Sequence, residues 1–252
     1  LYKNWNGAGD GRFKVMMGPH APYTCPPDYI RKVRDVAEKY DMPIHIHLSE
    51  TKGEVENCEK EYHMTPIALM DSLGLFERPT LAAHCVHVTD DDIRIMKEKH
   101  VCAAHNPASN LKLASGIAPV PKMRKAGITV GIGTDGASSN NKLDMFAEMR
   151  LTALIHKAAN YDPFAITAKE AVDMATKDGA KCLGYDNLGE LEEGFLADII
   201  LIDRTGFHWK PRFDSVSLAV YAGNSMDVDT VIINGRPVME HKELLTIDTE
   251  KM

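Results

Sequence analysis

The stretch that decides the fold is Ile44-His-Ile-His47-Leu-Ser-Glu50, a short apolar run that ends in polar residues. Alternate residues of a β-strand point to the same side, so His45 and His47 could form a metal-binding pair. In a second interpretation, only His47 lies at the strand end, and His45 lies one layer deeper as a core or supporting residue. Both interpretations predict a strand whose carboxyl end carries chemically active side chains.

Similar apolar runs recur along the chain and alternate with stretches of helical periodicity from residue 13 to about residue 183. This alternation is typical of parallel strands joined by helices. Strands are expected at residues 13–17, 44–48, 81–85, 101–104 and 128–133. Helices are expected to begin at Pro27-Asp28, at Thr65-Pro66 and at Thr89, where Asp92 would complete a capping box. Two further helices are expected over residues 144–157 and 168–183.

A polar residue stands in or shortly after the end of every expected strand. These residues are His20, His47, His84, Asn106 and Asp135. An open sheet would spread them along a line, about 5 Å apart per strand, whereas a (β/α) barrel brings strand ends to one mouth. The sequence therefore predicts an α/β fold in which residues 1–190 form about five βα units of a TIM-like barrel. Strand-like runs at residues 196–203 and 230–235 predict a small β segment over residues 191–252.

Two of these strand-end residues, His47 and Asp135, are candidate metal ligands. Imidazole and carboxylate suit a borderline divalent ion such as zinc, with iron, nickel or manganese as alternatives. A catalytic site needs three or four protein ligands and a position left for water. A competing interpretation makes Asp135, in Thr-Asp-Gly, a simple turn aspartate.

Composition narrows the classes of function. The chain of 252 residues is 44% hydrophobic and 26% charged, has a formal charge of -7 and contains no basic run, so nucleic acid is not an expected partner. No apolar stretch approaches the roughly 20 residues that cross a bilayer, so no membrane segment and a cytoplasmic location are expected. Five scattered cysteines indicate reduced thiols. Residue 1 is Leu in what reads as mid-domain sequence, so we expect a longer protein.

The order of the motifs resembles a known family. They are His47-Leu-Ser-Glu50-Thr, Ala82-Ala-His84-Cys-Val-His87, His105-Asn-Pro-Ala-Ser-Asn-Leu-Lys-Leu113, Gly116-Ile-Ala-Pro119 and Gly133-Thr-Asp135-Gly-Ala-Ser-Ser-Asn-Asn141. Together they resemble the amidohydrolase superfamily, and within it most closely the 5-methylthioadenosine/S-adenosylhomocysteine deaminases and their chlorohydrolase relatives. The resemblance covers nearly the whole chain and implies the C-terminal portion of a metal-dependent hydrolase barrel, with residues 191–252 in a small composite β-sandwich.

This resemblance implies a role for each candidate site residue. His47 and Asp135 would be metal ligands from the fifth and eighth barrel strands, Glu50 the proton shuttle, His84 a partner of the water or of the tetrahedral oxygen, and His20 a nucleoside contact. Glu50 and Asp135 would also contact the substrate. The family's other ligands form a His-x-His that would precede residue 1. A homo-oligomer is expected. His45, His87 and His105 are expected to support or pack, and Asn106 and Asn110 to hold their loop.

The function implied is hydrolytic deamination of adenosine-type nucleosides to inosine-type products and ammonia. Alternatives are a chlorohydrolase, a deaminase of another heterocycle such as a triazine or guanine, or a non-catalytic barrel fragment that serves as an assembly subunit. Glu50 favours deamination, because protonating a ring nitrogen requires an acid.

Overall fold

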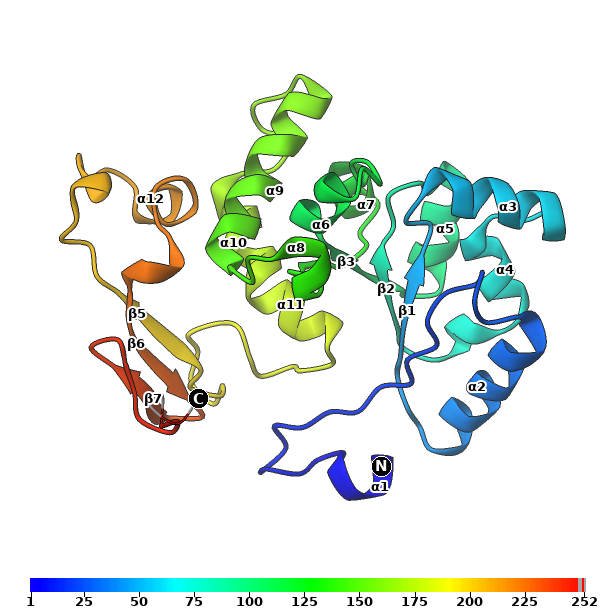
Figure 1. The fold of residues 1–252 in the computed structure, drawn as a ribbon, viewed down its shortest axis with the longest axis horizontal. Helices are drawn as coiled ribbons and strands as arrows, with labels where there is room; N and C mark the ends of the chain where they lie inside the picture. The colour runs from blue at the N-terminus through cyan, green and yellow to red at the C-terminus, as the bar shows by residue number, and fades with distance from the viewer. Residues whose placement is uncertain (249–250, 252) are drawn as a thin grey trace. The chain divides into compact units, whose positions relative to one another are not determined.

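The computed structural model describes residues 1–248 and 251, and these form two compact units, Leu1–Gly131 and Ile132–Met252. Figure 1 shows the course of the chain through them. The boundary between residues 190 and 191, which separates the expected barrel part from the β segment, stays a prediction. The α/β class is confirmed, because parallel strands alternate with helices.

The first sheet has the order β1-β2-β3-β4. Its strands are β1 (Ile44–Leu48), β2 (Thr80–His84), β3 (Cys102–His105) and β4 (Val130–Ile132). β1 pairs with β2 and β2 with β3 in parallel, with Ile46 opposite Ala82 and Ala82 opposite Ala103. These side chains are at most 1% exposed. Parallel strands need a buried setting, and the apolar runs of the sequence supply it.

The strand expected at residues 13–17 was wrong. Only Met17 forms a bridge, parallel to Ile44. The carbonyl of Phe13 accepts the N–H of Gly7, and the N–H of Val15 donates to the side-chain oxygen of Asn6. Because a local turn satisfies these backbone groups, they do not join the sheet.

Helices precede and follow the strands of the first unit, and α2 to α5 flank β1 and β2 (Figure 1). They are α1 (Tyr2–Trp5), α2 (Pro27–Lys39), α3 (Lys52–Tyr62), α4 (Pro66–Ser72), η1 (Leu75–Glu77), α5 (Asp90–Glu98), α6 (Pro107–Lys112) and α7 (Val120–Lys125). The expected starts of α2, α4 and α5 are confirmed, including the capping box between Thr89 and Asp92.

Three strand ends turn through left-handed backbone. Ser49 follows β1 with φ 53°, His84 ends β2 with φ 72°, and Asp135 follows β4 with φ 58°. Such conformations cost non-glycine residues about 1–3 kcal/mol and cluster at functional sites. The fold therefore holds its chemically active strand ends in backbone conformations that the surrounding contacts must maintain.

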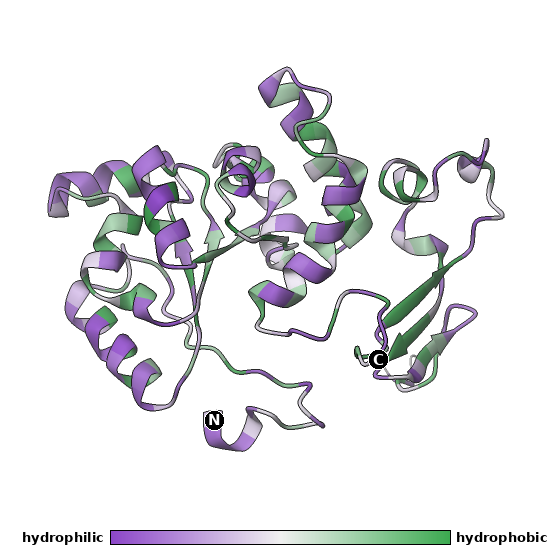
Figure 2. Ribbon diagram, turned by 180° about the vertical axis from the view of Figure 1, so that it is seen from behind, coloured by the Kyte–Doolittle hydropathy of each residue, from purple (hydrophilic) through white to green (hydrophobic). Residues whose placement is uncertain are grey.

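The second unit combines helices with an antiparallel sheet of order β5-β6-β7-β8. Its elements are α8 (Ala137–Asn140), α9 (Met145–Asn160), α10 (Ala168–Ala175), α11 (Lys177–Cys182), β5 (Ile199–Ile202), η2 (Phe207–Trp209), α12 (Ser215–Tyr221), η3 (Ser225–Asp227), β6 (Val228–Ile233), β7 (Arg236–Glu240) and β8 (Glu243–Leu244). Figure 2 shows the hydrophobic character of β5 and β6. The two strand-like runs of the tail are thus confirmed as β5 and β6.

The single helix expected over residues 168–183 is broken in the structure. The break lies at Thr176, whose backbone angles of φ -120° and ψ -98° are not helical. Its hydroxyl donates to the carbonyl of Val172, which satisfies one end of α10. Among the residues that the structure describes, no helix has the length and apolarity to cross a bilayer.

Buried His156 on α9 predicts a pH dependence of stability. Burial lowers its pKa from 6.5 to about 4. The unfolded chain therefore takes up the proton first, so this stability is complete above pH 6.5 and is lost as the pH falls toward 4. By pH 5 the free energy of unfolding should fall by about 2 kcal/mol from this group.

Urea unfolding at pH 7 and pH 5 measures this effect. His156→Gln should remove this part of the pH dependence, whereas His63→Asn, at an exposed residue, should retain it. An unchanged pH dependence in His156→Gln would contradict the assignment.

Candidate active site

His47 lies near the end of β1 with its ring orientation fixed. Its Nδ1–H donates to the carbonyl oxygen of His20 over 2.7 Å, and its backbone N–H donates to the same oxygen over 3.1 Å. This bond assigns the proton to Nδ1 and leaves a lone pair on Nε2. Metal-binding histidines typically use the same arrangement. His47 therefore fits the role of a ligand through Nε2.

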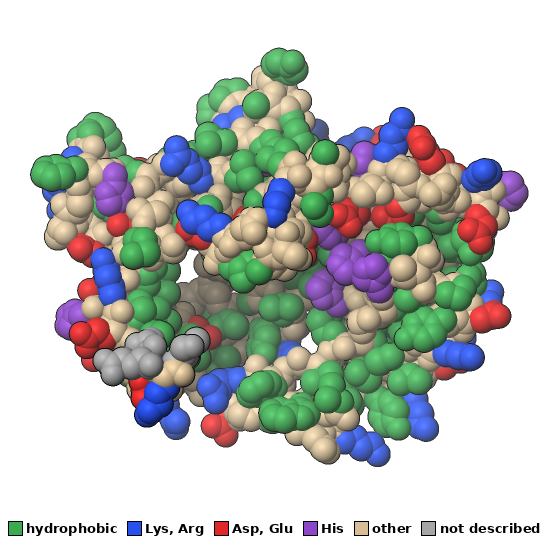
Figure 3. All heavy atoms as spheres, in the orientation of Figure 1, with side chains coloured by type: hydrophobic (Ala, Val, Ile, Leu, Met, Phe, Trp, Pro, Cys, Tyr) green, Lys and Arg blue, Asp and Glu red, His purple; other side chains and the backbone are tan. Residues whose placement is uncertain are grey.

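The imidazole of His47 lies between those of His20 and His84. The rings of His20 and His47 meet edge to face with centroids 5.1 Å apart, and those of His47 and His84 stack at 5.3 Å. Figure 3 shows histidine side chains gathered on one face of the molecule. His20 is exposed, contacts Thr24 Oγ1 through Nδ1 at 2.7 Å and packs its ring edge to face with that of Tyr23.

His84 is the buried member of this group and is 2% exposed. Its Nδ1–H donates to Asn110 Oδ1 over 2.8 Å, which leaves Nε2 as the proton acceptor of the neutral ring. That Nε2 lies 3.8 Å from Glu50 Oε2. The Asn106 side-chain nitrogen lies 3.5 Å from His84 Nδ1. His84 is therefore oriented by α6 toward the carboxyl of Glu50.

Glu50 follows β1 and is held at both its side chain and its backbone. Its side chain is 15% exposed, and Oε1 accepts a hydrogen bond from Ser115 Oγ at 3.3 Å. Ser115 is tied in turn by His87, whose Nε2–H donates to the Ser115 carbonyl over 2.7 Å. The Glu50 N–H donates to Glu54 Oε2 over 2.8 Å. His87 thus contacts Glu50 through Ser115, and its expected supporting role stays a prediction.

The structure corrects two of the sequence-based interpretations. His45 is exposed and is not a core residue, because the side of β1 that it shares with His47 is the less buried one. Asn110 was expected to hold its own loop, but its side-chain oxygen accepts the bond from His84, 26 residues away. Sequence reasoning also missed Ser115 and Glu54, whose partners lie in other elements.

Asp135 belongs to the second unit, whereas His20, His47, Glu50 and His84 belong to the first. Its Oδ1 accepts the Gly136 N–H over 2.7 Å, and its Oδ2 accepts the Ser139 hydroxyl over 2.8 Å. The structure brings the four residues of the first unit together, whereas the role of Asp135 stays a prediction.

The donor chemistry of His47 and Asp135 fits a divalent ion. An imidazole nitrogen with a fixed tautomer and an anchored carboxylate suit zinc or a similar metal. Among residues 1–248 and 251, no group of three or more His, Cys, Asp and Glu is arranged to hold a metal. These two residues would therefore contribute part of a ligand set.

The chain is similar to known proteins over most of its length. The model of the "Amidohydrolase family" matches residues 2–238. The chain is 55% identical to the 5-methylthioadenosine/S-adenosylhomocysteine deaminase of Dictyoglomus thermophilum, covering 99% of this chain and 59% of the relative. It is 51% identical to the enzyme of the same name from Pelotomaculum thermopropionicum, covering 99% and 58%. The chain thus spans less than two thirds of these relatives.

Solved structures show a similar fold. An adenosine deaminase from Xanthomonas campestris with bound zinc superposes with a TM-score of 0.94 at 37% identity, covering 98% of this chain and 56% of that one. A triazine hydrolase variant superposes with a TM-score of 0.93 at 29% identity, covering 100% and 56%. A guanine deaminase from C. acetobutylicum with bound guanine gives a TM-score of 0.84 at 25% identity, covering 94% and 57%.

Proposed function

The chain belongs to the amidohydrolase family, and from this premise we propose that the complete protein containing it deaminates adenosine-type nucleosides. The substrates would be 5-methylthioadenosine and S-adenosylhomocysteine, and the products an inosine-type nucleoside and ammonia. The observation that carries this proposal is the pair formed by Glu50 and His84 beside the free Nε2 of His47. A carboxyl at this place can protonate a ring nitrogen, which hydrolytic deamination of adenine requires.

We propose that His47 and Asp135 hold one divalent metal ion, zinc, with iron, nickel or manganese as alternatives. When bound, such an ion lowers the pKa of its water from 15.7 toward about 7. The zinc in the similar adenosine deaminase from Xanthomonas campestris supports this choice. His47 would bind through Nε2, because Nδ1 already donates to His20.

The residues of the chain then divide the proton transfers among them. Water adds to C6 of the adenine ring while Glu50 gives a proton to N1, so that no net charge builds up on the ring. His84 accepts a hydrogen bond from the adding oxygen through Nε2. Asp135 takes one proton from the water and passes it to the amino group, which leaves as ammonia. The proton of the hydroxyl added at C6 then returns to Glu50 as the C6 carbonyl forms. One water is consumed, and adenine becomes hypoxanthine.

His20 would contact the nucleoside, because its exposed ring lies beside His47 and packs against Tyr23. We also propose a cytoplasmic homo-oligomer that binds neither nucleic acid nor membrane. Residues 1–190 would belong to its barrel, and residues 191–252 to a composite β-sandwich. Light scattering of the complete protein measures the oligomeric state, and a monomer would contradict this part.

A second candidate is hydrolysis of another heterocycle, which the likeness to triazine hydrolase and guanine deaminase favours. The identities of 29% and 25% are below the 55% to the adenosine-type deaminase. The test incubates the complete, metal-loaded protein with 5-methylthioadenosine, S-adenosylhomocysteine, adenosine, guanine and a chlorotriazine. We expect ammonia release and the ultraviolet shift from adenine to hypoxanthine. Turnover of the triazine or guanine alone would refute the nucleoside proposal.

A third possibility is a scaffold without catalytic activity. Such a protein would bind no metal and turn over none of these compounds, so metal analysis in the same experiment distinguishes it from either enzyme. The oriented Nε2 of His47 argues against it, because a scaffold does not need that tautomer.

A further inference from the structure

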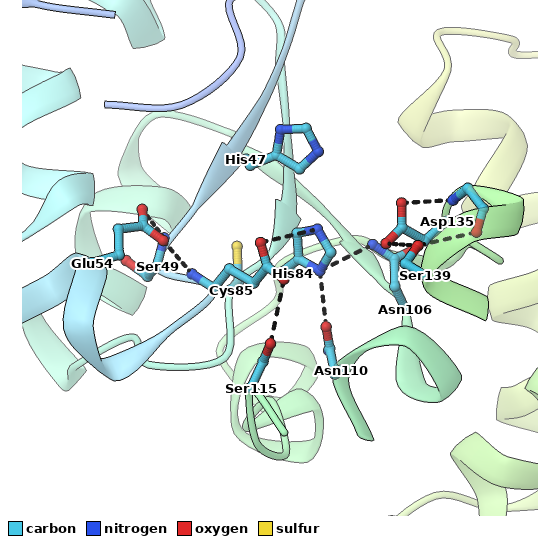
Figure 4. A network of polar contacts seen from close by, with 12 residues as sticks. His47, Ser49, Glu54, His84, Cys85, Asn106, Asn110, Ser115, Asp135 and Ser139 are labelled. Carbon is cyan, nitrogen blue, oxygen red and sulfur yellow. Dashed lines mark hydrogen bonds and ion pairs between the residues drawn. The ribbon is translucent and has the colours of Figure 1, made fainter. Parts of the chain in front are cut away.

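Glu54 lies in the first turn of α3 and binds the loop that carries Glu50. Its Oε1 accepts the Ser49 N–H and its Oε2 accepts the Glu50 N–H, both over 2.8 Å. Glu54 itself is only 6% exposed. Figure 4 shows this carboxylate turned toward Ser49. Two consecutive backbone groups of the loop therefore depend on one buried side chain.

Other helices of this chain use an acid at the same position differently. In α5 and in α10 the third residue closes a capping box with the residue that begins its own helix, as in Thr89 with Asp92 and Thr167 with Glu170. In α3 the N-cap Thr51 still accepts the Glu54 N–H. The Glu54 carboxylate, however, accepts the N–H groups of Ser49 and Glu50, which precede the helix. The Glu54 carboxylate therefore stabilises the loop that precedes α3.

The loop needs such an anchor because of its backbone. Ser49 is fully buried and has a φ of 53°, a left-handed conformation that costs a non-glycine residue about 1–2 kcal/mol. Its carbonyl is held from the other side by the His87 N–H over 2.9 Å. Glu54 also lines a cavity of about 220 Å³ together with Tyr23, Cys58 and Tyr62. On the side of the loop that faces this cavity, the loop is held by hydrogen bonds and not by close packing.

We propose that Glu54 is a positioning residue for deamination, which anchors the Ser49 and Glu50 N–H groups and thereby fixes the Glu50 carboxyl between His84 and Ser115. The proposal rests on the role given to Glu50 above. A displacement of about 1 Å of a catalytic group can lower the rate on the order of 100-fold. Burial raises the pKa of Glu54, whereas the backbone N–H groups that it binds stabilise its anion.

The test is Glu54→Gln in the complete protein. Glutamine keeps the shape and one accepting oxygen, but its NH₂ group cannot accept the second N–H. We expect kcat to fall by about 30-fold with KM within about twofold, since substrate contacts stay in place. Metal content should not change. Hydrogen exchange at the Ser49 and Glu50 N–H groups should accelerate by about 10-fold, because local opening of the loop becomes easier.

Glu170→Gln is the matched control. It removes an acid from the third position of another helix, far along the sequence, where the carboxylate accepts the Thr167 N–H and hydroxyl of its own helix start. It should leave kcat and the exchange at Ser49 and Glu50 unchanged. If Glu54→Gln does not fold, Glu54→Asp keeps the charge with a shorter reach, and it should lower kcat by at least about fivefold.

A folded Glu54 variant with wild-type kcat would overturn the proposal, whatever its exchange rate. A fall in kcat without faster exchange at Ser49 and Glu50 would overturn it as well. Failure of the proposed function is distinguishable, because the wild-type protein would then deaminate no adenosine analogue. The exchange comparison between Glu54→Gln and Glu170→Gln would still report whether Glu54 anchors the loop.

Discussion

Replacing Glu50 with Gln in the complete protein should lower kcat by about 10³-fold while the metal content stays unchanged. The amide has the same size as the carboxyl and can still accept the hydrogen bond from Ser115 Oγ. It cannot deliver a proton to N1 of the ring, so negative charge would build up on the ring as water adds. Because the loss affects the transition state more than binding, KM should change little.

Glu56→Gln is the control for this experiment. Glu56 lies on α3, where its carboxylate pairs with Lys52 at 3.3 Å on the surface. Such a pair contributes at most about 1 kcal/mol to stability, so Glu56→Gln should retain wild-type kcat. Steady-state kinetics on 5-methylthioadenosine, together with metal analysis, decides the outcome. A Glu50→Gln protein with a kcat within tenfold of the wild type would exclude Glu50 as the proton shuttle.

The strands of the first sheet could be predicted because each is an apolar run bounded by turn residues. Burial of Ile46, Ala82 and Ala103 in register is what such runs provide. The expected strand at residues 13–17 has the same local pattern, yet Asn6 and Gly7 bind its backbone. The turn and the sheet compete for the same backbone groups of residues 13–17. The hydrogen bonds of the turn leave no periodic signal in the sequence.

The candidate site divides in a similar way. His47, His84 and Glu50 could be predicted because each lies at the end of a strand that the sequence itself reveals. Few other polar residues lie at these strand ends. Ser115 reaches Glu50 across 65 positions and Asn110 reaches His84 across 26, so their roles depend on packing between elements. Glu54 was hidden for another reason, since an acid three residues after Thr51 has the spacing of an ordinary capping residue.

Ser49 illustrates the limit of local sequence information. A left-handed residue after a strand is usually predicted from glycine or asparagine, which adopt this conformation most readily. Here a serine adopts it because Glu54 and His87 bind both of its backbone groups. The conformation of the loop that carries Glu50 is therefore set by tertiary contacts.

Replacing His47 with Asn should remove most of the metal from the complete protein and lower kcat/KM on the order of 10⁴-fold, since water then keeps a pKa far above 7. The asparagine NH₂ can still donate to the His20 carbonyl, so the end of β1 should keep its fold. His63→Asn is the matched control, because His63 ends α3 at φ 56°, where asparagine is well tolerated. Metal analysis, circular dichroism and steady-state kinetics would be compared for both variants. If His47→Asn keeps a full metal complement, the ligand that anchors the proposed chemistry must lie elsewhere, and the free Nε2 of His47 would need another explanation.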